Sequence, residues 1–317
     1  MFKRPREEYD SDSEDGECSL HGRGLSLIRK LRDIEQGSVF LGIDEKSSEN
    51  VVVKRYSREC VQHKQSLSQM PLLEDPEQEI EVLAKLSGKH PNLVSLNRFF
   101  YDQTWIYVVM ECVSGGDLCD FLQLRSLSFG ETALLFKQLL SVVDFLHVHG
   151  IAHLDISPEN ILLKSDKKSI KLIDFGLAKM FVPDERRAVF KHGRPGKIRY
   201  MAPELFWDGK CDVVLADAYS CGIVLYNMVL ASYPYAIPGD KSFQKFFGSS
   251  AKELRERCIS RLPCSSSCSC TRENANVEES PCYLYCDLLS CLVARDKNRV
   301  TVSKALQHPF LKISKDS

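Results

Sequence analysis

The sequence lacks an excess of charge of either sign and lacks a long uncharged apolar run. Its 42 Lys and Arg balance 43 Asp and Glu, giving a net charge of −1, so nothing in the charge points to nucleic acid or an anionic membrane as a partner. No stretch reaches the roughly 18 apolar residues that a membrane span needs. The best candidate, 219–233, is short and contains Asn227, which predicts a buried core helix. We expect no nucleic-acid partner and no membrane partner.

The sequence also shows neither the apolar stretch of a secretory leader nor the cysteine pattern of a disulfide framework. The first ten residues, MFKRPREEYD, turn acidic where a leader would be apolar. The 13 cysteines are an odd number in a long chain, which favours reduced thiols. Between residues 256 and 282 the cysteines form no CxxC pair and have no histidine nearby, so ordinary thiols are preferred to zinc ligands there. These absences predict an intracellular protein, cytoplasmic or nuclear.

What is present is ordinary globular material. Hydrophobic residues make up 44% and charged residues 27% of the chain, enough for a sizeable core. Residues 1–24 stand apart because 8–17 contain six acids, which predicts a disordered acidic tail. The remainder, 25–312, is expected to be one folded domain with a Ser- and Cys-rich surface loop at about 256–282 and a short tail at 313–317.

Strand patterns dominate the first part of this domain and helical patterns the second. GSVFLGI and NVVVKRY are β-branched runs separated by a polar turn, and WIYVVMECV, 105–113, is a further buried strand. The helical patterns cover 76–87, 131–149, 213–230 and 283–294. The order predicts an α+β chain in two lobes, a small β-rich N-lobe at about 25–113 and a larger helical C-lobe at about 114–312.

One ordered set of polar residues carries the chemistry. In chain order it consists of Lys54 at the end of a strand, Glu79 on the next helix, Asp155 and Asn160 in HLDISPENILL, Asp174 in IDFGLAK and Glu204 in YMAPE. In this order and at these spacings the set resembles the eukaryotic protein kinase family, from about Leu25 to Phe310. Each motif alone is weak evidence for the family, whereas the whole set, in this order and at these spacings, is highly specific.

The resemblance implies a serine/threonine-type protein kinase that uses ATP and Mg²⁺ and acts on protein substrates. Phosphoryl transfer relies on positioning and charge neutralisation, because charge spreads over the phosphate oxygens. By resemblance, Asp155 accepts the proton of the incoming hydroxyl, and Asn160 and Asp174 bind Mg²⁺ through hard oxygen ligands. Lys54, fixed by Glu79, would hold the α- and β-phosphates.

The resemblance also implies a nucleotide pocket. Its residues would be Val39 and Val52 above the adenine, Met110 as gatekeeper, Glu111 and Val113 as hinge backbone groups, Asp117 on the ribose hydroxyls and Leu162 below the adenine. Apolar residues at these positions are also what any core needs. Two structural ion-pair residues match as well: Asp217 would brace the catalytic loop, and Arg299 would pair with Glu204.

The glycine-rich loop departs from the family pattern. Counting back from Lys54, its three glycines fall at Arg32, Ile34 and Gly37, and only Gly37 is a glycine. The two side chains are expected to stiffen the lid over the phosphates and weaken ATP binding. This departure supports the main alternative, a pseudokinase scaffold that binds nucleotide or partner proteins without efficient turnover. A small-molecule kinase of related fold is disfavoured by YMAPE and the helices after it.

The catalytic loop departs too. Leu154 stands where most family members have Arg, and 177–199 contain no Ser, Thr or Tyr, so control by phosphorylation of this segment is not expected. Ser157 stands where serine/threonine kinases have Lys. One hypothesis is that Lys197 reaches the space left by Ser157 and supplies the missing positive charge; the alternative is a solvated lysine in a basic segment.

The basic segment and the acidic tail have opposite charge. Residues 177–199 carry seven Lys and Arg against two acids, while 8–17 carry six acids. An intramolecular contact between tail and segment is one hypothesis, because the tether raises the effective concentration of the tail. The alternative is that both are solvated independently, since exposed pairs are weak and screened by salt.

Overall fold

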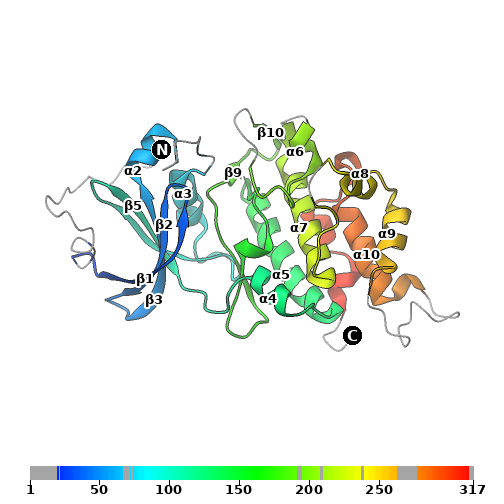
Figure 1. The fold of residues 1–317 in the computed structure, drawn as a ribbon, viewed down its shortest axis with the longest axis horizontal. Coiled ribbons are helices and arrows are strands. Elements are labelled where there is room, and N and C mark those ends of the chain that lie inside the picture. Colours follow the sequence, from blue (N-terminus) through cyan, green and yellow to red (C-terminus); the bar gives the residue numbers. More distant parts are fainter. Residues whose placement is uncertain are drawn as a thin grey trace. The chain divides into compact units, whose positions relative to one another are not determined.

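The computed structural model describes most of the chain, in two compact units. The described residues are 20, 22–66, 72, 74–190, 195–207, 210–236, 239–262 and 277–313. One unit, called the N-unit, comprises residues 1–88 and 94–112, and the other, called the C-unit, comprises 89–93 and 113–317. The N-unit is built on a β-sheet and the C-unit is mainly helical (Figure 1). The predicted α+β, two-lobed fold class is therefore confirmed.

The N-unit is a five-stranded antiparallel sheet, coloured blue to cyan-green in Figure 1, and its described residues also form helices α2 (Arg58–His63) and α3 (Pro76–Leu86). Its strands, in the spatial order β1–β2–β3–β5–β4, are β1 (Leu25–Ile34), β2 (Gly37–Asp44), β3 (Glu49–Ser57), β5 (Trp105–Glu111) and β4 (Leu96–Tyr101). The helix predicted at 76–87 is confirmed to within one residue, because the Asp75 side chain caps it by accepting the N–H groups of Glu77 and Gln78.

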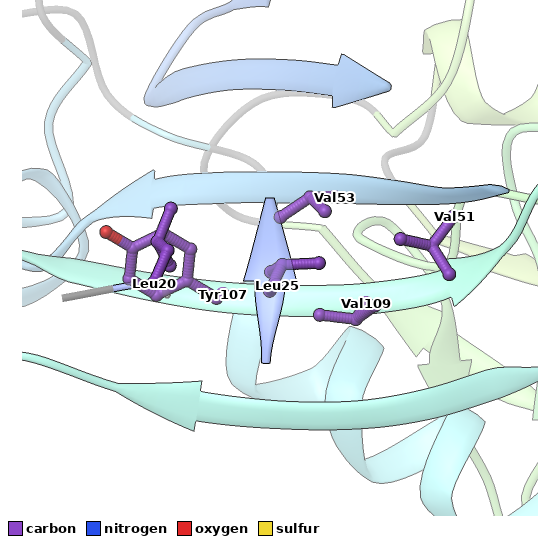
Figure 2. Packing of buried hydrophobic residues seen from close by; sticks show 6 residues of the cluster. All are labelled: Leu20, Leu25, Val51, Val53, Tyr107 and Val109. Carbon is purple, nitrogen blue, oxygen red and sulfur yellow. The ribbon is translucent and has the colours of Figure 1, made fainter. Parts of the chain in front are cut away.

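Strand alternation gives this sheet two different faces. One face forms an apolar cluster in which side chains from β1, β3 and β5 meet (Figure 2): Leu20, Leu25, Val51, Val53, Tyr107 and Val109. Successive side chains of a strand point to opposite faces. Val52, Lys54 and Tyr56 therefore lie on the face opposite this cluster.

The folded N-unit begins earlier than expected. Leu20 is only 2% exposed within the apolar cluster, and Arg98 Nη2 donates to the carbonyl of Gly24 at 3.0 Å. The predicted end of the tail at residue 24 is therefore wrong, because one leucine in a polar stretch completes the core. Residues 1–19 lie outside the described residues, so their predicted disorder, and a contact between them and the basic segment, remain predictions.

The C-unit is a helical body with three short strand pairs. Its α-helices are α4 (Leu118–Leu124), α5 (Phe129–Val148), α6 (Pro203–Trp207), α7 (Val213–Leu230), α8 (Lys241–Phe247), α9 (Ala251–Ile259), α10 (Pro281–Leu292) and α11 (Val302–Ala305). The strand pairs are β6 (Ile151–Ala152) with β9 (Lys179–Met180), β7 (Ile161–Leu163) with β8 (Ile170–Leu172), and β10 (Arg187–Val189) with β11 (Lys210–Asp212). The 3₁₀ turns are η1 (Pro158–Asn160), η3 (Val277–Glu279), η4 (Asp296–Asn298) and η5 (Pro309–Lys312).

Helix α7 is the central element of the C-unit. In the described part of the chain it alone is long and apolar enough to cross a membrane, yet 89% of it is buried inside the structure. Gly222 lets it pack closely on the end of α10, since a Cβ there would lie 2.7 Å from Val293 Cγ1. The apolar run near 219–233 is thus used for packing, as the sequence predicts.

The Ser- and Cys-rich stretch 256–282 is less irregular than expected. Helix α9 runs to Ile259 and α10 begins at Pro281, so the predicted loop is wrong at both ends. Residues 263–276 lie outside the described residues. Within the described ranges no group of three or more His, Cys, Asp or Glu side chains could hold a metal.

Candidate active site

A buried ion pair forms in the N-unit between β3 and α3. Lys54 Nζ lies 2.8 Å from Glu79 Oε1, with side-chain exposures of 6% and 0%. The Tyr56 hydroxyl donates to the other Glu79 oxygen, which satisfies a carboxylate that burial would otherwise destabilise. Lys54 and Tyr56 are two residues apart on one strand, so strand alternation places both on the side covered by α3.

The strand register brings further predicted residues to the same face. Val39 of β2 is the direct partner of Lys54, and Met110 of β5 is the direct partner of Val52. Directly opposed residues of antiparallel strands project to one side. Val39, Val52, Met110 and Lys54 therefore share one sheet face, opposite the apolar cluster.

The β1–β2 connection is a tight hairpin. Ile34 pairs with Gly37 across a two-residue turn, and Arg32 pairs with Val39. A Cβ at Gly37 would lie 1.9 Å from the Arg55 carbonyl, so the glycine kept from the family pattern is needed for β2 to approach β3. The effect of Arg32 and Ile34 on ATP binding stays a prediction.

The catalytic loop of the C-unit is fixed by one buried carboxylate. Asp217 of α7 accepts the backbone N–H of His153 through Oδ2 and that of Leu154 through Oδ1, both at 2.8 Å. His147 Nε2 lies 2.9 Å from the same Oδ2. Leu154 has φ of +61°, an unfavourable backbone for a leucine. The two hydrogen bonds to Asp217 hold it there, as expected for a brace.

His153 links the catalytic loop to the segment that carries Asp174. Its Nδ1 accepts the N–H of Asp155 at 3.2 Å, so Nε2 carries the ring proton and donates to the Ile173 carbonyl at 3.0 Å. The ring also packs 4.9 Å from the ring of Phe175. Asp174, between these two contacts, has φ of +71°, a strained conformation of the kind that clusters at functional sites.

Both oxygens of Asp155 are held by neighbours. Oδ1 accepts the backbone N–H of Lys197 at 2.9 Å, while Oδ2 accepts Asn160 Nδ2 at 2.7 Å and Lys197 Nζ at 3.0 Å. The Asn160 amide also donates to the Asp155 carbonyl at 2.9 Å. The three contacts to Oδ1 and Oδ2 fix the orientation of the carboxylate, and the fourth holds its backbone.

The Lys197 side chain reaches Ser157, as one of the two sequence hypotheses proposes. Besides Asp155, its Nζ donates to Ser157 Oγ at 3.0 Å. Ser157 is fully buried, whereas the Lys197 side chain is 39% exposed. The ammonium therefore occupies the space beside the small serine, and the structure shows this contact directly.

Gly196 makes this approach possible. Its φ is +91°, and a Cβ there would lie 2.3 Å from the Leu154 carbonyl. Any side chain would therefore push the segment carrying Lys197 away from the catalytic loop. Gly196 was not among the predicted site residues, and neither was Tyr56. Alternation with Lys54 could have indicated Tyr56, whereas no local pattern singles out Gly196.

The oxygen atoms of Asn160 and Asp174 suit a hard cation. The Asn160 amide nitrogen makes both hydrogen bonds to Asp155, and among the described residues none is donated to Asn160 Oδ1. Ile173 N–H donates to the Asn160 carbonyl at 3.0 Å, which ties the residue preceding Asp174 to this loop. One amide oxygen and one carboxylate match the donor types that Mg²⁺ prefers.

The remaining predicted nucleotide residues are divided between the units. In the C-unit, Asp117 bridges to Leu162, and its Oδ1 accepts Asp120 N–H at the start of α4. Burial raises the pKa of Asp117 above its ordinary value; the hydrogen bond from Asp120 N–H opposes this rise, and the negative charges of Asp120 and Glu159 add to it. In the N-unit, the N–H of Glu111 donates to the Ser95 carbonyl, so of its backbone groups only the carbonyl is a candidate for a ligand. Val113 is half-buried in the C-unit.

The segment after Asp174 is anchored to the C-unit near both of its ends. Strand β10 pairs with β11, and Arg186 lies 3.2 Å from Asp212. Further along, Arg299 forms a two-pronged pair with Glu204, at 2.6 and 3.1 Å, so the predicted structural ion pair is present. Both contacts fix the ends of the segment within the C-unit.

Comparisons with known proteins agree with this geometry. A family model described as the protein kinase domain matches residues 28–311. The chain is 31% identical to serine/threonine-protein kinase ULK3 of Rattus norvegicus over 291 residues, 91% of this chain and 55% of that protein. It is 33% identical to human ULK3 over 242 residues (76% and 47%), and 32% identical to CBL-interacting protein kinase 21 of Oryza sativa subsp. japonica over 212 residues (63% and 40%). The chain spans about half the length of these curated relatives.

Proposed function

Because the chain belongs to the protein kinase family, we propose that it transfers the γ-phosphoryl group of ATP to Ser or Thr hydroxyls of protein substrates. The observation that carries this proposal is the fixed carboxylate of Asp155, held through three hydrogen bonds by Asn160 and Lys197. A pair of oriented carboxylate oxygens is what aligning an incoming hydroxyl requires.

Asp155 acts as the base in this proposal. The incoming hydroxyl donates to the Asp155 carboxylate, its oxygen attacks the γ-phosphorus, and the bond to the β,γ-bridging oxygen breaks to release ADP. The proton passes to Asp155. Asn160 and Lys197 keep the carboxylate aimed during this step, so their main contribution is positioning.

Asn160 and Asp174 would hold Mg²⁺ through oxygen atoms, and the ion when bound would neutralise charge on the phosphate oxygens. Lys54, oriented by Glu79, would contact the α- and β-phosphates. Gly37, Val39, Val52 and Met110 with the Glu111 carbonyl on the N-unit, and Val113, Asp117 and Leu162 on the C-unit, are proposed nucleotide contacts.

Lys197 is proposed to supply the positive charge that Ser157 lacks. An ammonium 3.0 Å from Asp155 Oδ2 lies beside the point where the hydroxyl must dock, and therefore beside the phosphoryl group being attacked. Positive charge at that place stabilises the charge that develops in the transition state. The main-chain contact of Lys197 with Asp155 keeps the side chain near the base throughout turnover.

An assay with radiolabelled ATP and generic protein substrates tests the proposal. Wild-type protein should label Ser and Thr, as identified by phosphoamino-acid analysis, and Asp174→Asn should reduce labelling to background. Nucleotide binding measured by thermal shift with ATP and Mg²⁺ separates the alternatives. Binding without labelling by wild-type protein would favour the pseudokinase; labelling that survives Asp174→Asn would exclude the proposed site.

A further inference from the structure

Two arginines converge on one open cavity of the C-unit. The cavity measures about 450 Å³ and is lined by Arg199, Arg261, two tyrosines and Ser242, and none of the described residues in its wall is a carboxylate. In the described part of the chain, neither Arg199 nor Arg261 forms an ion pair. Surface arginines commonly pair with acids, so two unpaired guanidinium groups facing one hollow indicate a site for an anion.

Aromatic contacts hold Arg199 in place. Its guanidinium lies 4.6 Å from the Tyr233 ring centroid, and the Tyr235 hydroxyl donates to its backbone carbonyl at 3.0 Å. Tyr233 is itself fixed, because its hydroxyl accepts that of Tyr200 at 3.0 Å. A cation stacked on an aromatic face keeps its N–H edge available for a ligand. Arg199 therefore loses little conformational freedom on binding an anion.

Arg261 is held from the other side. Its Nη1 donates to the Tyr226 hydroxyl at 2.7 Å, which leaves most of the guanidinium fork uncommitted. One acid, Asp240, acts through its charge on Tyr235 of the cavity wall, and it accepts Phe243 N–H at the start of α8. Among the described residues, no acid lines the cavity beside the two arginines.

The cavity is close to the reacting centre along the chain. Arg199 follows Lys197 by two residues, and Lys197 contacts Asp155 through both its backbone and its ammonium. Two residues span at most about 7 Å. A side chain only a few residues from the acceptor hydroxyl can therefore reach Arg199.

We propose that this cavity is a specificity subsite that binds an anionic side chain of the protein substrate, a carboxylate or a phosphoserine close to the acceptor residue. The inference rests on the proposed kinase function and names a class of substrate for it. A guanidinium fork matches the planar carboxylate and the phosphate through paired N–H···O bonds.

Peptide phosphorylation tests the subsite. The substrates are peptides with one central Ser and a single Ala, Glu, Lys or phosphoserine at each of four positions on either side. At one or two positions, Glu or phosphoserine should raise kcat/KM at least five-fold over Ala, and Lys should lower it. The ratio between Glu and phosphoserine shows which anion the site prefers.

Arg199→Gln and Arg261→Gln should each reduce this acid-to-Ala ratio to below two-fold, and Arg261→Glu should favour Lys at the same position. Arg257→Gln is the matched control, because Arg257 lies one helical turn earlier and outside the cavity wall. An unchanged ratio in both Gln variants, with unaltered melting temperatures, would overturn the inference while leaving the kinase function intact.

Binding provides a readout that does not require turnover. Fluorescence polarisation with a labelled phosphoserine peptide should show tighter binding than with its Ser counterpart, and Arg261→Glu should abolish the difference. Equal binding of the two peptides would overturn the subsite. A wild-type protein that binds the phosphopeptide but phosphorylates nothing would refute the proposed kinase function and retain the anion site.

Discussion

Each unit holds one lysine–carboxylate pair of the predicted site residues, and the two pairs are built in opposite ways. Lys54 and Glu79 are 6% and 0% exposed and are set by a strand and a helix, with Tyr56 as a third partner. Lys197 and Asp155 are 39% and 12% exposed and are set by loops, with Gly196 allowing the approach. The Lys54–Glu79 pair is part of the core of the N-unit. The Lys197–Asp155 pair depends on the position of the loop segment that carries Lys197.

The difference indicates which pair can change in evolution. Removing one partner of a buried pair leaves an uncompensated charge and costs about 3–5 kcal/mol. A half-exposed lysine carries no such penalty, so its charge can be moved to another position without unfolding the protein. Under the proposed function, Ser157 with Lys197 is such a relocation relative to the family pattern.

The largest expected effect is loss of the base. Asp155→Ala should lower kcat by at least about 10²-fold, because the incoming hydroxyl loses its acceptor and its alignment. Single-turnover phosphorylation of a generic protein substrate measures this directly. Since Asp155 belongs to the pair that is set by loops, the melting temperature should change little. Full activity in this variant would exclude the proposed mechanism.

Breaking the buried pair should affect both activity and stability. Lys54→Met should reduce kcat/KM for ATP on the order of 10²-fold and leave Glu79 buried without its cation. A lower melting temperature should accompany the loss. Glu79→Gln with Lys54 intact is the comparison variant; if neither variant is less stable, the pair is not the structural element described above.

Moving the lysine charge from position 197 to position 157 tests whether the loop pair tolerates a change that the buried pair does not. Lys197→Met should lower kcat by about 10- to 100-fold with little change in melting temperature. Combining it with Ser157→Lys should recover at least part of the loss, because the ammonium returns to the same space from the other side. Lys179→Met, an exposed lysine of β9, serves as control. Wild-type turnover in Lys197→Met would refute the catalytic role of Lys197.

A contact between the acidic tail and the basic segment should have a smaller effect on activity than these substitutions. If the acidic tail covers the basic segment, deleting residues 1–19 should raise activity toward peptides about two-fold at low salt, with the gain shrinking as salt increases. The deletion retains Leu20, which belongs to the core. Equal activity of deleted and full-length protein at low ionic strength would refute the contact.

Loss of the surface ion pair between Arg125 and Glu131 should have the smallest effect, and this effect is on stability. Arg125 and Ser128 lower the pKa of Glu131 to about 2, so its contribution to stability is present above the unfolded-state pKa of about 4.3 and is lost as pH falls toward 2. Glu131→Gln should therefore lower the melting temperature by about 1–2 °C at pH 7. Thermal melts across this pH range should show the difference disappearing in acid.

The sequence predicts the order of elements well because strand alternation and helical periodicity are local. The register of β3 follows from its pattern, and the helix at 76–87 from Pro76 and its apolar stripe. Even the contact of Lys197 with Ser157 could be inferred, since a missing charge in one motif suggested a cation in another. Leu20 and Gly196 could not, because their importance depends on atoms distant in sequence: the sheet core for one and the Leu154 carbonyl for the other.

The segment between Asp174 and Glu204 is pinned by β10–β11 and by Lys197, and residues 177–199 offer no hydroxyl for a modifying enzyme. The sequence therefore predicts that this segment takes up its arrangement on folding, without being phosphorylated. Protein made in bacteria would be assembled at this segment without help from an upstream enzyme. The output of such a molecule would follow how many copies a cell makes and destroys, rather than a reversible mark on this segment.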